Sequence, residues 1–291
     1  MPATLVDYAI PLIAAVSISF SMVLAKLVLR DTDAGSFMFF RSFSGLVLSL
    51  LLLPTVGVQH APTYAYGLLA LSVLLAPFLM NMLFFTGVRY ADVGTESAIL
   101  QSTPVFVVLG EAAILNVIAL PAAWVGVGVI LAGVVILVSG TNHAPPRLAV
   151  LLGLAAAAVN GTNLVILAVV LRFFPRITLM AAQNIAYAAM ATVMFLRTRK
   201  QQSHAGAKAA SFPVVVMSII SGLLVQVIFI YLKLTSIERL GSLVTSVLVL
   251  SQLPVTMLLS CLLLGDRLHR RKLVAAAAIV LGAVAVTLAN R

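Results

Sequence analysis

Long apolar runs, joined by short connections, make up almost all of this sequence. Each run is close to the roughly 20 residues that a helix needs to cross the hydrocarbon core of a bilayer. Only 9% of the residues are charged and 62% are hydrophobic, whereas about a quarter of the residues in an average soluble domain are charged. The sequence therefore predicts an all-α integral membrane protein with ten transmembrane helices. The predicted spans are 8–29, 35–53, 64–87, 93–115, 121–139, 148–171, 177–197, 212–232, 240–263 and 270–289.

The chain divides near its middle into two similar halves. A linker rich in Gly and Pro, residues 140–147, separates five predicted spans from the other five. Aligning Pro104 with Pro254 to within a residue also aligns Gly133 with Gly282, so we expect repeats at 1–140 and 147–291 in one compact membrane domain. Because each half has an odd number of spans, the second half enters the membrane upside down, which gives a five-plus-five inverted repeat. Inverted repeats with a site near the bilayer midplane are typical of secondary transporters.

The cations of the chain are explained by membrane topology. The 18 Lys and Arg residues, set against 8 Asp and Glu residues, give a formal net charge of +10, but most of the cations lie in short connections between spans. We therefore predict the lipid bilayer as a partner and no nucleic acid. The odd-numbered connections hold more cations than the even-numbered ones, which predicts that both termini lie outside the cytoplasm. Residues 1–8 contain no basic residue, and the first span is longer than the apolar part of a signal peptide, so we expect this helix to be retained.

Two polar stretches interrupt the fourth and ninth spans near their middles. They are Gln101-Ser102-Thr103-Pro104 and Ser251-Gln252-Leu253-Pro254. Proline cannot donate to the carbonyl four residues earlier, so each stretch frees one acceptor beside polar side chains. Lipid offers such groups no partner, and they are expected to face the bundle interior or a wet cavity. We therefore predict Gln101, Ser102, Pro104, Ser251, Gln252 and Pro254 as substrate-binding residues; kinks that only shape the bundle are the alternative.

Five further polar residues extend this candidate site. Ser19 lies in the first span, and Asn160 and Asn163 lie in the sixth, which aligns with the first. Asn81 in the third span and Gln226 in the eighth are lone amides in apolar helices. We predict that all five line a central cavity, with hydrogen bonding between helices as the alternative.

Charged residues inside spans cost about 2.5 to 3.5 kcal/mol each at a helix centre, so they need a partner or a role. Arg41 lies roughly 9 Å into the second span, and Glu96 enters the fourth span from the same side. An Arg41–Glu96 pair would neutralise both; alternatively, the planar guanidinium of Arg41 binds a substrate carboxylate. Glu111 lies about 22 Å beyond Glu96 along its helix. We expect Glu111 to point toward Lys233 or Arg172, with proton coupling as the alternative.

The sequence has no motif for catalysis or for a cofactor. All four His residues lie in connections, the single Cys261 lies in an apolar run, and there is no phosphate-binding glycine loop. We predict no cofactor, no metal site and no enzyme activity. A membrane-embedded enzyme acting on a lipid-linked substrate is the alternative from another functional class.

Several motifs resemble those of the EamA-type members of the drug/metabolite transporter superfamily. The fourth span carries Pro104-Val105-Phe106, the second carries Phe40-Arg41, and the ninth ends in Leu264-Gly265-Asp266-Arg267. Asn160-Gly161-Thr162-Asn163 looks like the Trp-Gly-Ser-Asn signature of that family without its tryptophan. The resemblance covers nearly the whole chain and implies the same ten-helix fold.

The resemblance also implies a function. It suggests a secondary transporter that moves a small polar metabolite by alternating access, such as an exporter of an amino acid or a related compound in the bacterial inner membrane. Nucleotide sugars, lipid-linked sugars and drugs are the alternative substrates. Family membership would place both termini in the cytoplasm, opposite to the cation count. We expect the monomer to be the functional unit, with a homodimer as the alternative.

Overall fold

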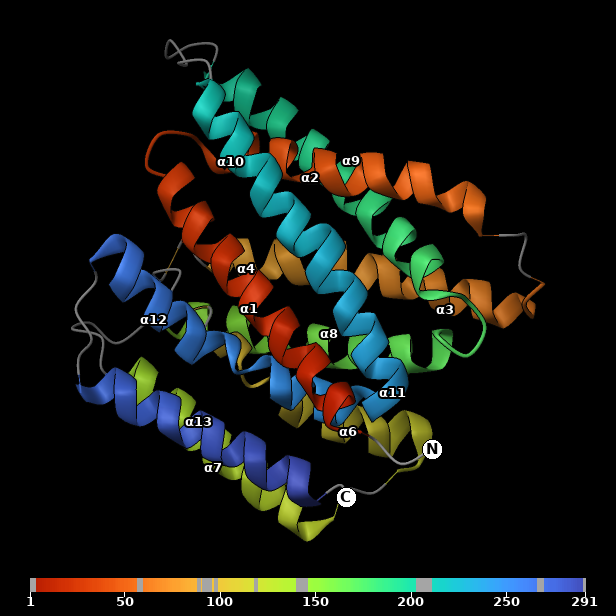
Figure 1. The fold of residues 1–291 in the computed structure, drawn as a ribbon, viewed down its shortest axis with the longest axis vertical. Coiled ribbons are helices and arrows are strands. Elements are labelled where there is room, and N and C mark those ends of the chain that lie inside the picture. The colour runs from red at the N-terminus through yellow and green to blue at the C-terminus, as the bar shows by residue number, and fades with distance from the viewer. Residues whose placement is uncertain are drawn as a thin grey trace.

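The computed structural model describes residues 4–56, 60–87, 90, 96, 99–117, 120–139, 146–202, 211–265 and 270–289. Within this part of the chain every regular element is helical, and the helices pack side by side in one bundle (Figure 1). The predicted linker between the repeats and Asp266-Arg267 of the last motif lie outside the described residues, apart from Pro146 and Arg147 of the linker.

The first half of the chain begins with two long helices, of which the second starts at a side-chain cap. Asp33 precedes that helix, and its carboxylate accepts the Ser36 N–H at 2.8 Å, which satisfies one of the unpaired donors of the first turn. The helices of this half are α1 (Leu5–Val28), α2 (Ala34–Leu52), the short η1 (Leu53–Thr55), α3 (Thr63–Val73), the π-helical η2 (Leu74–Met80), α4 (Asn81–Gly87), α6 (Thr103–Leu115) and α7 (Pro121–Val138).

The second half repeats this order of helices. Its elements are α8 (Arg147–Val170), α9 (Arg176–Gln202), α10 (Phe212–Gly222), the π-helical η3 (Leu223–Phe229), α11 (Ile230–Val249), α12 (Gln252–Leu264) and α13 (Arg270–Ala289). The continuity of α11 is only apparent, because Gly241 has a φ of +83° inside it. Glycine adopts this left-handed conformation without the steric cost that a side chain would bring. The helix therefore breaks at Gly241, and residues 242–249 belong to the predicted ninth span.

The structure confirms an all-helical membrane protein but gives fewer full-length spans than the sequence predicts. Within the described residues, six helical stretches are long and apolar enough to cross a bilayer: Leu5–Val28, Ala34–Thr55, Thr63–Phe84, Arg147–Val170, Arg176–Arg199 and Phe212–Val249. Four shorter apolar helices occupy the fourth, fifth, ninth and tenth predicted spans: Thr103–Leu115, Pro121–Ile136, Gln252–Leu263 and Leu273–Ala289. The helices in the fourth and ninth predicted spans are short because a break divides each run in two.

Irregular features recur at matching places in the two halves. Aligning Gly133 with Gly282 places η2 on η3, each a π-helical segment of seven residues. The same alignment places α6 on α12, each of 13 residues. Both of these helices end in a left-handed residue, Asn116 with φ 54° and Gly265 with φ 69°. Because π-helices are rare, their correspondence indicates that the halves share one architecture.

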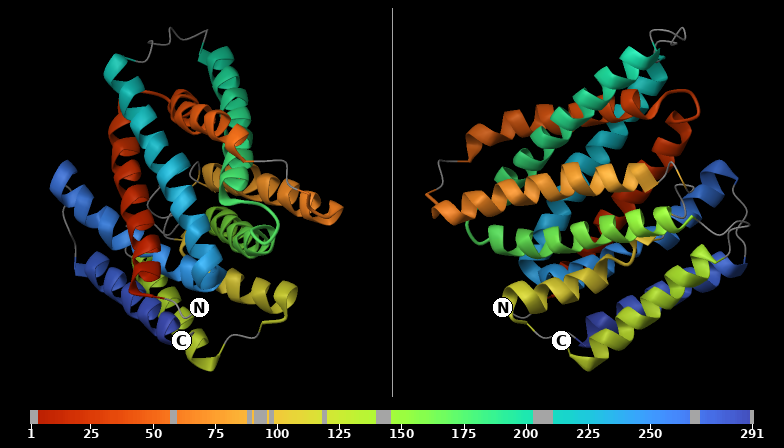
Figure 2. Two further views of the ribbon diagram at one scale, coloured as in Figure 1. Left: turned by 45° about the vertical axis from the view of Figure 1, so that its right-hand side comes forward. Right: turned by 180° about the vertical axis from the view of Figure 1, so that it is seen from behind.

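The packing between the halves is also reciprocal. Helix α2 packs on α9 and α7 packs on α13, so that equivalent helices meet (Figure 2). Helix α1 packs on α12 and α8 packs on α6, which is the same contact seen from each repeat. At the α7–α13 contact, a Cβ atom added to Gly282 would lie 2.6 Å from the carbonyl oxygen of Gly126. These two backbones therefore approach as closely as glycine allows.

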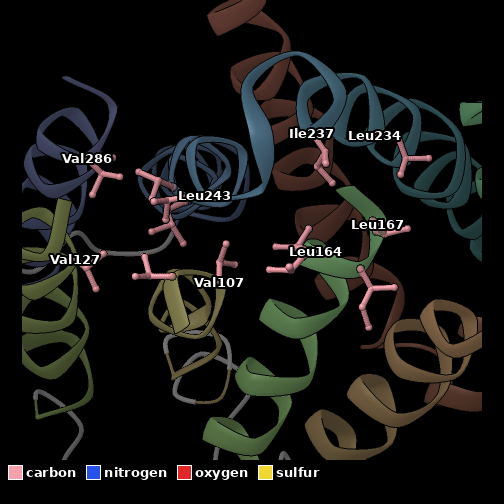
Figure 3. Close-up of a cluster of buried hydrophobic side chains, with 14 of the residues drawn as sticks. Val107, Val127, Leu164, Leu167, Leu234, Ile237, Leu243 and Val286 are labelled. Atoms are coloured by element: carbon pink, nitrogen blue, oxygen red, sulfur yellow. The ribbon is translucent and has the colours of Figure 1, made fainter. Parts of the chain in front are cut away.

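Buried apolar side chains join the two repeats. Leu164 and Leu167 lie three residues apart on one face of α8 and pack with Leu234 and Ile237 of α11 and with Val107 of α6 (Figure 3). This core fixes α6 against the second repeat and thereby positions the helix break that precedes it.

Candidate functional site

The two polar stretches form equivalent helix breaks. Before α6 the chain makes a turn at Gln101 and Ser102, and before α12 it makes a turn at Leu250 and Ser251. The hydroxyl of Ser102 donates to the carbonyl of Ile99 at 2.8 Å, and that of Ser251 donates to the carbonyl of Leu248 at 2.7 Å. The same local hydrogen bond thus stabilises the turn in each repeat.

The carbonyls that the prolines release have local partners. The carbonyl of Leu100 accepts the hydroxyl of Thr103 at 2.6 Å, and the carbonyl of Leu250 accepts the N–H of Leu253 at 3.0 Å. We expected these oxygens to be open acceptors. Instead, each carbonyl oxygen already accepts one hydrogen bond within its own turn, because a short turn brings a donor of the residue three positions later close to it.

Gln101 and Gln252, one from each repeat, lie next to each other. The Nε2 atom of Gln252 lies 3.5 Å from the Oε1 atom of Gln101, at the long limit of a hydrogen bond. Both side chains are buried, with 4% and 9% of their surfaces exposed. Ser19 of α1 completes this group by donating its hydroxyl to the backbone carbonyl of Gln252 at 2.9 Å. The structure therefore brings together the polar residues of the first, fourth and ninth predicted spans.

The sixth predicted span contributes Asn160 and Asn163. The Nδ2 atom of Asn160 donates to the hydroxyl of Thr103 at 3.3 Å, which connects it to the turn before α6. Asn163 is fully buried, and neither its Oδ1 nor its Nδ2 atom has a hydrogen-bond partner among the described residues. A buried amide without partners costs free energy. Asn163 is thus a polar group that a bound molecule could satisfy.

Asn81 and Gln226 take part in hydrogen bonds that do not involve the side chains of Gln101 and Gln252. Asn81 donates to the carbonyl of Pro77 in its own helix at 2.9 Å, which serves the backbone around η2. The backbone carbonyl of Gln226 accepts a hydrogen bond from the Nδ2 atom of Asn184 at 3.0 Å, and the same nitrogen donates to the hydroxyl of Ser49 at 3.0 Å. Gln226 thus joins a polar contact between α2, α9 and η3 rather than the glutamine pair.

Arg41 occupies a second polar cluster, which is partly buried. Its Nη2 atom donates to the hydroxyl of Ser21 at 3.3 Å, and its guanidinium carbon lies 5.5 Å from the centre of the Phe37 ring. Tyr187 of α9 also interacts electrostatically with Arg41, and the Ser21 and Ser221 hydroxyl oxygens lie 2.7 Å apart. Tyr187 and Ser221 could not be predicted as members of this cluster, because a single hydroxyl in an apolar helix does not reveal its partner.

The expected Arg41–Glu96 ion pair is wrong. In the described part of the chain, Arg41 makes the contacts given above, and no ion pair joins it to Glu96. Cβ atoms added to Gly87 and Gly153 would fall 2.6 Å and 2.8 Å from Glu96 carboxylate atoms. Glu96 thus lies between α4 and α8, whereas Arg41 faces α1 and α9. Similar depth in the membrane did not place the two residues on facing helix surfaces.

The expected partners of Glu111 are also wrong. Its Oε1 atom accepts the hydroxyl of Ser242 at 2.5 Å and the N–H of Leu243 at 3.1 Å. These donors follow the break at Gly241, so the carboxylate caps the restarted helix from the other repeat. Lys233, which we expected nearby, instead places its Nζ atom 5.4 Å from the Phe229 ring.

Among the described residues, no three His, Cys, Asp or Glu side chains come together in a group that could hold a metal ion.

Comparisons with known proteins identify relatives of the whole chain. The sequence model of the EamA-like transporter family matches residues 7–139 and, a second time, residues 147–288. No curated protein matches the chain. A solved structure, titled only "Crystal structure of protein", is similar with a TM-score of 0.73 at 18% sequence identity, over 98% of each chain. At this identity the likeness concerns the fold alone, and it extends over both repeats.

Proposed function

The chain belongs to the EamA-like transporter family, and we propose that it moves a small polar solute by alternating access at a site built around Gln101 and Gln252. It is a multi-pass integral membrane protein in a family of transporters. One observation carries the proposed site: the amides of Gln101 and Gln252, from the two repeats, face each other at 3.5 Å next to equivalent helix breaks.

The recurring features support a ten-span, inverted arrangement of the two repeats. In this proposal the breaks at Ser102 and Ser251 divide the fourth and ninth spans, and the break at Gly241 separates the eighth span from the ninth. The reciprocal contacts α1–α12 and α8–α6 are those expected of two units related by a two-fold axis in the membrane plane.

The glutamine contact suits a site that opens and closes. A hydrogen bond between neutral amides contributes only about 0.5–1.5 kcal/mol net, and the observed separation is long. When the repeats rock apart, each amide can exchange its partner for a donor or acceptor on a solute. Asn163 and Ser19 extend the set of polar groups around the pair.

The narrower features of the proposed function come from the resemblance of the sequence motifs. We propose an amino acid or related metabolite as the solute, export as the direction, the bacterial inner membrane as the location, and the monomer as the functional unit. Nucleotide sugars, lipid-linked sugars and drugs are the competing solutes, and an amide pair can hydrogen-bond to any of them.

Counterflow of labelled compounds into proteoliposomes tests this function. We expect saturable counterflow of at least one panel member, and a roughly tenfold loss in Gln101→Ala and in Gln252→Ala, the effect of about 1.4 kcal/mol. Thr287→Ala is the matched control, because the Thr287 hydroxyl bonds only to the carbonyl of Ala283 in its own helix, at 2.8 Å. Wild-type rates in both glutamine variants, at normal protein levels, would show that the pair only holds helices together.

A further inference from the structure

Arg41 is a cation held deep in an apolar helix by neutral groups. Its recorded contacts are the Ser21 hydroxyl at 3.3 Å, the Phe37 ring at 5.5 Å and Tyr187. Its Nε atom is covered by protein and has no hydrogen-bond partner among the described residues. Donors of this strength are normally satisfied in a protein interior.

No carboxylate neutralises this charge in the described part of the chain. The ion pairs there are Arg176–Glu238, with 3.0 Å between Nε and Oε2, and Arg239–Asp7, with 2.5 Å between Nη1 and Oδ1. Neither involves Arg41. An intramembrane charge without a counterion is costly, and a guanidinium that keeps an open donor is suited to an anion that comes and goes.

We propose that Arg41, with Ser21 and Tyr187, forms a carboxylate-binding subsite, and that the transported solute is a small metabolite bearing a carboxylate. A guanidinium presents parallel donors that match the two oxygens of a carboxylate. The guanidinium carbon lies 5.5 Å from the centre of the Phe37 ring, so this ring occupies one side of the proposed subsite. The single positive charge of this cluster matches a carboxylate monoanion better than a doubly charged phosphate.

The subsite lies at the depth of the glutamine pair. Ser21 and Ser19 are two residues apart on α1, or about 3 Å along the helix axis. Ser21 contacts Arg41, and Ser19 donates to the Gln252 carbonyl at 2.9 Å. Residues two apart on a helix point to different sides, so α1 stands between the two polar groups. Movement of α1 would therefore act on the anion subsite and on the central pair together.

Because this assignment rests on the proposed transport function, its test needs a readout of binding besides one of transport. The probes are L-alanine, L-threonine, L-phenylalanine and succinate, their carboxamides, and glycerol 3-phosphate. In wild-type proteoliposomes we expect counterflow of at least one carboxylate probe and a KM about tenfold or more higher for its carboxamide. Arg41→Gln should raise the KM for the carboxylate at least tenfold and leave that for the carboxamide unchanged. Arg41→Lys should fall between, since it keeps the charge but not the planar fork.

Thermal unfolding of the detergent-purified protein gives the second readout. The carboxylate probe should raise the Tm of the wild type, because a ligand that binds only the folded state stabilises it. Its carboxamide should not, and Arg41→Gln should show no shift. Arg176→Gln is the control, since it removes a cation that is already paired with Glu238. If Arg41→Gln does not purify as a folded protein, Tyr187→Phe replaces it, with a smaller rise in the carboxylate KM.

The outcomes separate the two proposals. Equal transport of carboxylates and carboxamides, preference for the phosphate, or retained discrimination in Arg41→Gln would overturn the subsite while transport stands. A lack of any Tm shift with every carboxylate would overturn it whatever the transport result. No counterflow of any compound, together with an Arg41-dependent Tm shift, would overturn the transport function and leave the anion site.

Discussion

Glu111 should stabilise the fold by capping a helix of the opposite repeat. Gly241 interrupts α11, so the first N–H groups of the restarted helix have no partner in their own helix. The carboxylate of Glu111, reaching across from α6, accepts one of these, the N–H of Leu243, as well as the hydroxyl of Ser242. We predict that Glu111→Ala destabilises the protein and that Ser242→Ala removes part of the same interaction.

The size of this effect follows from the two hydrogen bonds. A hydrogen bond to a charged group contributes about 1.5–3 kcal/mol, and the helix dipole adds about 0.3–1 kcal/mol for a carboxylate at an N-terminus. Partial exposure reduces both, so we expect Glu111→Ala to lower the free energy of unfolding by about 3 kcal/mol. Glu111→Gln keeps an acceptor but loses the charge, and should cost only about 1 kcal/mol.

A double-mutant cycle isolates the contact. Equilibrium unfolding in mixed micelles of dodecyl maltoside and sodium dodecyl sulfate would be measured for the wild type, Glu111→Ala, Ser242→Ala and the double variant. The single Ser242 change should cost about 1 kcal/mol, and the coupling energy should be about 1–2 kcal/mol. A coupling energy within about 0.3 kcal/mol of zero, the usual scatter for independent sites, would refute the capping role of Glu111.

Three further substitutions test one contact between helices and one helix cap. Gly282→Ala should destabilise the protein by about 1–3 kcal/mol, because the new Cβ would lie 2.6 Å from the Gly126 carbonyl oxygen. Gly128→Ala is the control, since no atom lies within 4 Å of its Cβ position. It should be neutral or slightly stabilising in the same unfolding assay. Asp33→Ala should cost about 1 kcal/mol by removing the cap of α2. Burial raises the pKa of Asp33, but the hydrogen bonds from Ser36 outweigh it and bring the pKa below its ordinary value of 3.8. The cap therefore contributes fully above about pH 4 and is lost as the pH falls through the lowered folded-state pKa, so the gap in unfolding free energy between wild type and variant should close in acid.

The features that the sequence predicted well depend on local chemistry and on the repeat. The prolines at 104 and 254 cannot complete a helical hydrogen bond, and the helices do break just before them. The duplication then made the two polar stretches equivalent. This equivalence led to the expectation of a shared central position for Gln101 and Gln252, and the amides do lie 3.5 Å apart.

The wrong expectations concern contacts between helices. Depth along a span can be counted from the sequence, but the direction of a side chain around its helix depends on which helices are neighbours. Arg41 and Glu96 were placed at similar depth, yet they face α1 and α9 in one case and α4 and α8 in the other. The partner of Glu111 is a helix start that exists only because Gly241 breaks the chain.

The polar group around Gln101 and Gln252 lies where the two repeats pack together, and no single motif accounts for its position. Gln101 lies in the turn before α6 and Gln252 begins α12, so the two amides meet beside the two breaks. The α1–α12 and α8–α6 contacts then bring Ser19 and Asn160 to the same two breaks. A motion that separates the repeats must therefore alter this polar group, because the Gln101–Gln252, Ser19–Gln252 and Asn160–Thr103 hydrogen bonds each join one repeat to the other.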